Sequence, residues 1–424
     1  MNVLLISANR EDINMPTLPL GLACVAAAVD QAGHAVRFLD LLQVQDVAAA
    51  VEEAIRLSRP GAIGVSVRNI DDQSMEQGRF LLDQAREVVR LCRQLSAAPI
   101  VLGGAGYSIF PQSALEYLEA DMGIQGEGEA AFPMLLERLE QERDLAGVPG
   151  LHLPGRRLQG PLSFIRDLDR LPYPEPALFA ATDCSKGEAW LPYQTRRGCP
   201  LDCSYCSTAS IEGRITRRRS PEAVVANLAG WAKSGFSRIY FVDNTFNRPA
   251  SYAIELCRRI TEAGLRIKWR CIFYPGRASP ELVEAMAKAG CREVSLGFES
   301  GCDAILQALN KRFGVGEVRE ASRLLAEFGI RRMGFLLLGG PGETRATVEE
   351  SLAFAESLNL DALKLTLGIR IYPNTGLARR AVEDGLIAPS DPLLFPRFYL
   401  SEKLQPWLRE TVALWAEGRP NCFF

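Results

Sequence analysis

Short apolar runs alternate with longer amphipathic stretches over the first 142 residues. The apolar runs, each typical of a buried strand, cover residues 2–7, 62–66, 99–104 and 121–125, and residues 34–40 predict a further, more amphipathic strand. Strands that alternate with amphipathic helices predict right-handed βαβ units and an open parallel sheet. We therefore expect a doubly wound α/β domain over residues 1–142.

The same alternation resumes at about residue 190. Six further strands are predicted over residues 190–195, 238–242, 267–273, 292–298, 332–338 and 361–367. Helical patterns lie between them, for example over residues 221–234, 279–289 and 345–358. Because six βα units are too few to close an eight-stranded barrel, we predict a partial (β/α)6 barrel of the TIM type over residues 191–385.

Two segments do not follow this alternation. Residues 143–190 lose the period and are rich in Pro and Gly, which indicates a linker between the domains. Residues 386–424 contain one amphipathic stretch and predict a short C-terminal helical extension.

Composition agrees with two globular domains. A chain of 424 residues exceeds one ordinary core, and 47% hydrophobic with 23% charged residues is typical of folded proteins. The net charge of −3 gives no reason to expect nucleic acid as a partner. No apolar run reaches about 18 residues, so no membrane span is predicted. The start lacks the basic region of a signal peptide, and we expect a cytoplasmic protein.

Glycine and polar residues gather where the first strands end. The segments concerned are 8–19, 66–72, 103–106 and 126–129. Any one of these turns could be a plain tight turn. In open parallel sheets, however, ligands bind beyond the carboxyl ends of the strands, at the point where the strand order reverses. Four such segments at one edge therefore favour a ligand site.

The chain contains 11 cysteines but only two histidines, His34 and His152. The scarcity of histidine disfavours histidine-based acid–base chemistry and histidine-rich metal sites. Five cysteines lie in apolar-periodic segments and are expected to be small buried residues: Cys24, Cys92, Cys257, Cys271 and Cys291.

Only Cys199, Cys203 and Cys206 have the spacing of metal ligands. Three thiolates on one short loop can bind three irons of a cubane cluster and leave the fourth iron open. An open iron can bind a small chelating group and pass it an electron. The alternative is a structural zinc ion, which needs four ligands and could recruit Cys184.

The motif Cys-x-x-x-Cys-x-x-Cys, with aromatic Tyr205 before its last cysteine, resembles the radical S-adenosylmethionine superfamily, as does the six-unit barrel that follows. The resemblance implies that S-adenosylmethionine (SAM) chelates the open iron of a 4Fe–4S cluster and is cleaved reductively. The products are methionine and a 5′-deoxyadenosyl radical.

Further segments match the family at the ends of barrel strands. The resemblance implies that the SAM-binding residues are Tyr205, Asp243, Asn244, Glu299, Ser300, Gly339 and Gly340. A carboxylate such as Glu299 at the end of a barrel strand is also typical of an active site. Many members carry Gly-Gly-Glu after the second strand, where this chain has Asp243-Asn244-Thr245. That replacement is familiar in the branch with an additional N-terminal domain.

The first domain resembles the Rossmann-like cobalamin-binding domain of the cobalamin-dependent branch. The resemblance implies cobalamin contacts from Pro19, Gly21, Ser66, Arg68, Asn69, Gly103, Gly104, Gly126, Glu127 and Glu129. Other cobalamin domains bind cobalt from below through a histidine after the first strand, but residues 8–14 contain none. We expect His34 at the surface or at a strand edge, and we expect His152 in the linker. Arg68 and Asn69 are the candidates for the lower face of cobalamin.

These resemblances imply a C-methyltransferase. The deoxyadenosyl radical would take hydrogen from an unactivated carbon of a small metabolite, and methylcobalamin would donate the methyl group. The electron would come from an external reductant such as flavodoxin or ferredoxin. No catalytic acid or base is assigned.

Three alternatives remain open at this stage. Cobalamin could assist an oxidation, ring rearrangement or cyclisation without methyl transfer. The first domain could be a recognition module without cobalamin, or the whole chain a non-catalytic iron–sulfur sensor or electron carrier. Near the end of the chain, Cys422 could face solvent, or it could reach the site as a thiol.

Overall fold

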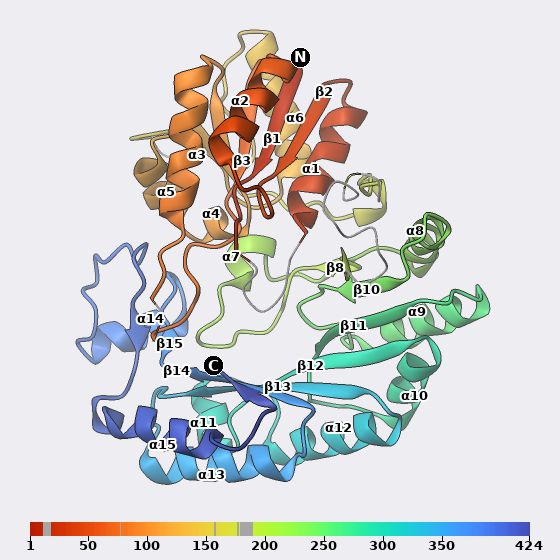
Figure 1. Cartoon of the computed structure of the whole chain (residues 1–424), viewed down its shortest axis with the longest axis vertical. Coiled ribbons are helices and arrows are strands. Elements are labelled where there is room, and N and C mark those ends of the chain that lie inside the picture. The colour runs from red at the N-terminus through yellow and green to blue at the C-terminus, as the bar shows by residue number, and fades with distance from the viewer. Residues whose placement is uncertain (12–17, 77, 157, 176–177, 179–189) are drawn as a thin grey trace. The chain divides into compact units, whose positions relative to one another are not determined.

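The computed structural model describes residues 1–11, 18–76, 78–156, 158–175, 178 and 190–424 (Figure 1). The chain forms two compact units. The first comprises Met1–Asp72, Gly78–Lys186 and Ser207–Arg218, and the second comprises Gln73–Gln77, Gly187–Cys206 and Arg219–Phe424. Each unit is therefore built from segments that are not contiguous in the sequence.

The first unit contains a six-stranded sheet with the order β2-β1-β3-β4-β5-β6. Its strands are β1 (Asn2–Ser7), β2 (Ala35–Asp40), β3 (Ala62–Ser66), β4 (Ile100–Gly103), β5 (Met122–Ile124) and β6 (Leu151–His152). The first five are parallel, and β6 pairs antiparallel with β5. The predicted doubly wound α/β fold is confirmed.

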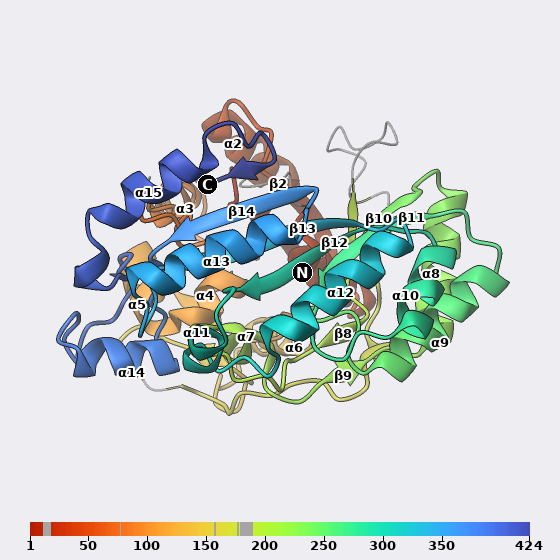
Figure 2. The same ribbon diagram turned by 90° about the horizontal axis from the view of Figure 1, so that it is seen from below.

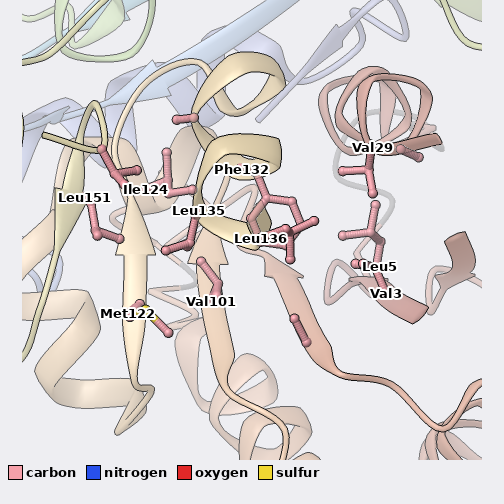
Figure 3. Close-up of a cluster of buried hydrophobic side chains, with 14 of the residues drawn as sticks. Val3, Leu5, Val29, Val101, Met122, Ile124, Phe132, Leu135, Leu136 and Leu151 are labelled. Carbon is pink, nitrogen blue, oxygen red and sulfur yellow. The ribbon is translucent and has the colours of Figure 1, made fainter. Parts of the chain in front are cut away.

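Helices cover this sheet and bury its apolar faces. They are α1 (Leu20–Gln31), α2 (Val47–Ser58), α3 (Leu82–Leu95), α4 (Ala105–Ile109), α5 (Pro111–Leu118) and α6 (Gly128–Glu140). Figure 3 shows Phe132, Leu135 and Leu136 of α6 against strand residues that include Leu5 and Val101, and all of them are buried. Strands buried on both faces read as continuous apolar runs, which explains why the sequence predicts them.

The second unit contains a seven-stranded sheet with the order β17-β14-β13-β12-β11-β10-β7, in which every neighbouring pair is parallel. Its strands are β7 (Leu191–Tyr193), β10 (Arg238–Phe241), β11 (Lys268–Phe273), β12 (Cys291–Glu299), β13 (Arg331–Leu338), β14 (Ala362–Leu367) and β17 (Cys422–Phe423). Six of them are the strands predicted for the partial barrel.

The helices of this unit follow the strands in turn. They are α8 (Pro221–Lys233), α9 (Ala250–Glu262), α10 (Pro280–Lys288), α11 (Asp303–Ala308), α12 (Val315–Glu327), α13 (Arg345–Ser357), α14 (Gly376–Glu383) and α15 (Trp407–Ala416). Figure 2 shows α10, α12 and α13 along one face of the sheet. Along β11, β13 and β14, fully buried residues alternate with half-buried ones. One face of the sheet is therefore fully buried, and we assign the half-buried face to the barrel interior.

Local sequence sets where several helices begin. Ser220 and Ser279 precede Pro221 and Pro280, and each serine Oγ accepts a backbone N–H of its helix at 3.2 and 3.3 Å. Proline suits the first helical turn because its missing N–H would have no partner there.

The five cysteines expected in the core are at most 2% exposed, which confirms that prediction. No helix among the described residues is both long and apolar enough to span a membrane.

Six strands of two residues each, among the described residues, were not predicted. Four of them lie outside the two large sheets: β8 (Arg196–Arg197), β9 (Arg217–Arg218), β15 (Ile369–Arg370) and β16 (Phe398–Tyr399). Residues 151–152, placed in the linker by the sequence, form the edge strand β6. Residues 422–423 add β17 to the barrel sheet, and Cys422 pairs with Leu363 near the amino end of β14. Since β14 ends at Leu367, Cys422 lies about 13 Å along the strand from the carboxyl end. The idea that its thiol reaches a site at the carboxyl ends is therefore wrong.

Candidate functional site

The three predicted ligand cysteines lie on the loop that follows β7. Cys199 is 9% exposed, Cys203 is half-buried and Cys206 is exposed. Gly198 has a φ of 83°, a conformation that glycine adopts without strain, and it lets the chain turn into the loop. The N–H of Cys206 donates to the carbonyl of Cys203 at 3.1 Å, so these two cysteines flank one tight turn.

Asp243, just beyond the end of β10, anchors the start of this loop. Its Oδ1 accepts the backbone N–H groups of Thr195 and Arg196 at 2.7 and 3.0 Å, and its Oδ2 accepts the Thr195 hydroxyl at 2.6 Å. The Arg196 Nε lies 3.4 Å from Oδ2. Burial raises the pKa of Asp243, while Arg196 and the hydrogen bonds of Thr195 act against that rise. The carboxylate is thus used to fix the loop.

Tyr205, Glu299 and Lys311 form a buried polar cluster beside the cysteines. The Tyr205 hydroxyl donates to Glu299 Oε1 at 3.0 Å, and Lys311 Nζ donates to both groups at 2.8 and 3.2 Å. The Lys311 and Glu299 side chains are only 6% and 11% exposed. Burial raises the pKa of Tyr205 well above its usual value. Burial alone would lower the pKa of Lys311, but Glu299 and Tyr205 raise it well above its usual value.

Two more predicted SAM contacts follow the strands β10 and β12. Ser300 is fully buried, and its hydroxyl lies 3.0 Å from that of Ser351 on α13 and accepts the N–H of Cys302 at 3.2 Å. Ser300 therefore links the end of β12 to a helix. Asn244 is half-buried directly after Asp243.

Gly339 and Gly340 directly follow β13, and both of their N–H groups donate to Oε2 of Glu343. Gly339 has a φ of 97°. Glu343 is 4% exposed, and its Oε1 is buried without a hydrogen-bond partner. Burial raises the pKa of Glu343 to about 7, although the two backbone donors act in the opposite direction. The two glycine amides thus form a donor pair at the barrel mouth.

The donor set of the loop fits an iron–sulfur cluster. It supplies three thiols, and burial raises the pKa of Cys203 while the nearby Lys311 lowers it. Within the described part of the chain, no three Cys, His, Asp or Glu side chains could hold a single metal ion. A cubane instead binds each thiolate at a separate iron. Cys184, the alternative fourth ligand, lies outside the described residues.

The first unit has a cavity where its strand order reverses. The order 2-1-3-4-5 places this point between β1 and β3. A small cavity there is lined by residues 8, 9 and 11 after β1, residues 67–69 after β3 and residues 81, 84 and 85. Arg68 and Asn69, predicted to lie beneath cobalamin, are therefore at the switch point of the sheet.

Polar side chains order the rim of this cavity. Glu11 accepts hydrogen bonds from Arg79 Nη1 at 2.7 Å and from Gln84 Nε2 at 3.0 Å. The Nε of Arg79 also donates to the carboxylate of Asp72 at 3.3 Å. Ser66 is half-buried at the end of β3.

The glycine turns at this edge serve the chain's own packing. Gly104 has a φ of 99°, and a Cβ at this position would lie 2.6 Å from the carbonyl oxygen of Val67. Gly126 has a φ of 88° and begins the turn into α6. A Cβ at Gly103 or Gly21 would meet nothing closer than 4.0 Å. Position 104 thus requires glycine because the backbone of Val67 approaches it closely, whereas the space beside Gly103 is open.

Glu127 is used inside the first unit. Its Oε1 pairs with Arg217 Nη1 at 2.6 Å and its Oε2 accepts the N–H of Ile165 at 2.7 Å, with both side chains about 5% exposed. This pair fastens Ser207–Arg218, the segment that directly follows Cys206, to the first unit. Glu129 is buried in the first turn of α6, and Pro19 is half-buried before α1. The cobalamin roles of these residues stay predictions.

Both histidines are engaged in the first unit. His34 precedes the edge strand β2 but is only 8% exposed, and its Nδ1 lies 3.1 Å from the N-terminal amine of Met1. His152 lies on β6 with Nε2 3.1 Å from Gln125 Oε1, and burial lowers its pKa.

Lys311 and Glu343 were not predicted from the sequence. Glu343 follows the glycine pair that the family resemblance marks, and its short separation from Gly339 and Gly340 is the signal that could have indicated it. Lys311 lies beyond a short helix after β12, and no periodic or spacing rule marks it.

Two family models match the chain. The radical SAM superfamily matches residues 193–355, and the B12 binding domain matches residues 6–136. Each match lies within one of the two predicted domains.

Similar proteins cover nearly the full chain. An uncharacterized methyltransferase, PH0819, of Pyrococcus horikoshii is 27% identical over 97% of this chain and 91% of its own length. The tryptophan 2-C-methyltransferase of Streptomyces laurentii is 26% identical over 88% of this chain and 74% of its own length. The solved structure of the radical SAM methyltransferase TsrM from Kitasatospora setae, with cobalamin and a [4Fe-4S] cluster bound, superposes with a TM-score of 0.87 at 23% identity, covering 100% of this chain and 90% of that one. Both units therefore share the fold of that protein.

Proposed function

We propose that this chain, which belongs to the radical SAM proteins that carry a B12-binding domain, is a methyltransferase acting on an unactivated carbon of a small molecule. The observation that carries the proposal is the presence of two candidate sites in one chain. One is the cysteine loop at the end of β7, and the other is the cavity at the switch point of the first unit. The two methyltransferases that are similar over 97% and 88% of the chain support methyl transfer.

Cys199, Cys203 and Cys206 would hold a 4Fe–4S cluster with one iron open to SAM. When bound, the cluster supplies the electron that cleaves SAM, and cobalamin supplies the methyl group. The chain's own share is to place the reacting groups and exclude water, a role that needs little histidine and agrees with the two histidines of the chain.

The proposed SAM contacts divide into two kinds. Tyr205, Asn244 and Glu299 lie where barrel strands end and are suited to direct contact. Gly339 and Gly340 also follow a strand, but their N–H groups donate to Glu343, so any contact with SAM would come from other backbone atoms of these glycines. Asp243 and Ser300 are fully buried and engaged within the protein. We propose that these two act by holding the loops that carry the others.

Cobalamin is proposed to bind at the switch point of the first unit. Arg68 and Asn69 would lie beneath cobalt, and Gly103 leaves space for close approach. Pro19, Gly21, Ser66, Gly104, Gly126, Glu127 and Glu129 complete the proposed set. Because axial ligands set a cofactor's electronics, a lower face without histidine would favour methyl donation.

The substrate is proposed to be a small metabolite, as tryptophan is for one similar enzyme by its name. Flavodoxin or ferredoxin would be the electron donor, and the cytoplasm the location.

Product analysis tests this function. The protein is reconstituted anaerobically with iron, sulfide and cobalamin, and then given dithionite and SAM with a deuterated methyl group. We expect both S-adenosylhomocysteine and 5′-deoxyadenosine by mass spectrometry. Deoxyadenosine without S-adenosylhomocysteine would favour a cobalamin-assisted oxidation or rearrangement. If neither product forms, the result would favour a non-catalytic iron–sulfur protein.

Two cysteine variants control the experiment. Cys203→Ala should abolish deoxyadenosine because it removes a cluster ligand. Cys422→Ala should leave it unchanged because Cys422 pairs near the amino end of β14. Deoxyadenosine from the Cys203 variant would contradict the proposal.

A further inference from the structure

Three consecutive residues that follow helix α11 contact the cysteine loop. The N–H of Ser204 donates to the carbonyl of Leu309 at 3.0 Å. The side-chain amide of Asn310 donates to the carbonyl of Asp202. Lys311 reaches the Tyr205 hydroxyl at 2.8 Å. The segment 309–311 therefore holds the loop between its first and last cysteines at three successive positions.

The backbone at Asn310 explains how a short segment makes these contacts. Its φ of 56° is in the left-handed region, which asparagine enters more readily than most residues. Asn310 lies two residues after α11 has ended at Ala308, where the positive φ prevents the helix from continuing. On the other side of the loop, the N–H of Leu377 in α14 donates to the carbonyl of Ser204 at 2.7 Å. The loop is thus fixed from two elements of the second unit.

Lys311 is the charged member of this segment. Its Nζ is 3.2 Å from Glu299 Oε1, and it lies 5.1 Å from the centre of the Tyr205 ring and 5.8 Å from that of Phe313. A buried ammonium group is expensive to desolvate unless it is paired and hydrogen-bonded, and here it is both. Its position beside Tyr205 and Glu299 is consequently well defined.

We propose that Lys311 is a positioning residue of the cluster loop, which holds Tyr205 in place and sets the reduction potential of the cluster through its buried positive charge. This inference rests on the proposed function, since it requires that Cys199, Cys203 and Cys206 bind a 4Fe–4S cluster. Reduction adds a negative charge to the cluster, so a nearby cation favours the reduced form and a nearby carboxylate opposes it. Lys311 and Glu299 should therefore act with opposite sign.

The test uses matched variants of the full chain, reconstituted with iron and sulfide and without SAM. Lys311→Gln removes the positive charge and keeps a donor. Glu299→Gln removes the negative charge and keeps an acceptor. Lys288→Gln is the control, because Lys288 is 65% exposed on α10 and pairs with Glu284 in its own helix. Reduction is followed by electron paramagnetic resonance at controlled potentials.

At the wild-type midpoint, Lys311→Gln should lower the ratio of reduced to oxidised cluster by about tenfold, the scale of one buried unit charge. Glu299→Gln should raise the ratio, Lys311→Arg should restore it towards the wild-type value, and Lys288→Gln should leave it unchanged. Lys311→Gln should also lose iron faster to a chelator. If it folds by circular dichroism but takes up no iron, the positioning role is supported.

Shifts of the same sign in Lys311→Gln and Glu299→Gln would overturn the proposal, as would a Lys311→Gln chain that behaves like the control. If Lys311→Gln does not fold, the other two variants decide. The proposal then requires that Glu299→Gln raises the ratio of reduced to oxidised cluster and that Lys311→Arg stays near the wild-type ratio. A wild-type chain that binds no cluster would instead refute the proposed function itself.

Discussion

Glu343 should make the stability of the second unit fall as pH rises towards 7. Its carboxyl group has a pKa of about 7 in the folded chain against an ordinary value of 4.5, chiefly because it is buried. The folded state therefore holds this proton more tightly than the unfolded state. Its contribution is fully present below pH 4.5 and is lost as pH rises through about 7. The difference between the two pKa values corresponds to about 3 kcal/mol.

Glu343→Gln removes this dependence with little change in shape. The amide oxygen can still accept the N–H groups of Gly339 and Gly340, and no buried charge forms at high pH. Between pH 5 and pH 8 the free energy of unfolding of the variant, relative to wild type, should rise by about 3 kcal/mol.

Tryptophan fluorescence during urea unfolding is a suitable assay. All five tryptophans, at positions 190, 231, 269, 407 and 415, lie in the second unit, so their signal reports that unit. Glu349→Gln, at an exposed site on α13, is the matched control and should keep the wild-type pH profile. If Glu343→Gln and wild type show parallel pH profiles, the burial argument is refuted.

Four further predictions concern the loop, the first unit and the chain end. Asp243→Ala should destabilise the second unit by about 3–5 kcal/mol in the same fluorescence assay, because it leaves the buried Arg196 without its carboxylate. Asp243→Asn should lower the free energy of unfolding by less. Arg217→Met should destabilise the first unit by a similar amount in calorimetry, because Glu127 loses its buried partner. Arg68→Ala should let added imidazole change the visible spectrum of bound cobalamin, which it should not do in wild type. Cys422→Ala should change neither iron content nor activity.

The strands and the cysteine loop could be predicted because their signals are local. Buried parallel strands are continuous apolar runs, and the spacing of Cys199, Cys203 and Cys206 is a property of eight adjacent residues. Helix starts such as Ser220-Pro221 are equally local. Short edge strands gave no such signal: β6 and β17 have two residues each, too few for any period.

The polar partners inside the site could not be predicted because they depend on tertiary contacts. Lys311 is 106 residues from Tyr205, and Arg217 is 90 residues from Glu127. The family resemblance implied that Asp243 is a cofactor contact. It could not indicate that the backbone N–H groups of Thr195 and Arg196 would donate hydrogen bonds to this carboxylate.

The central claim is that one chain binds an iron–sulfur cluster and cobalamin at separate sites. The most direct measurement is the iron and cobalt content of anaerobically reconstituted wild type and of Cys203→Ala. We predict about four irons and one cobalt per wild-type chain. The variant should lose its iron and keep its cobalt, because the proposed cobalamin site is in the first unit, which the B12 binding domain model matches over residues 6–136. Wild type without cobalt, or a variant with undiminished iron, would contradict the account.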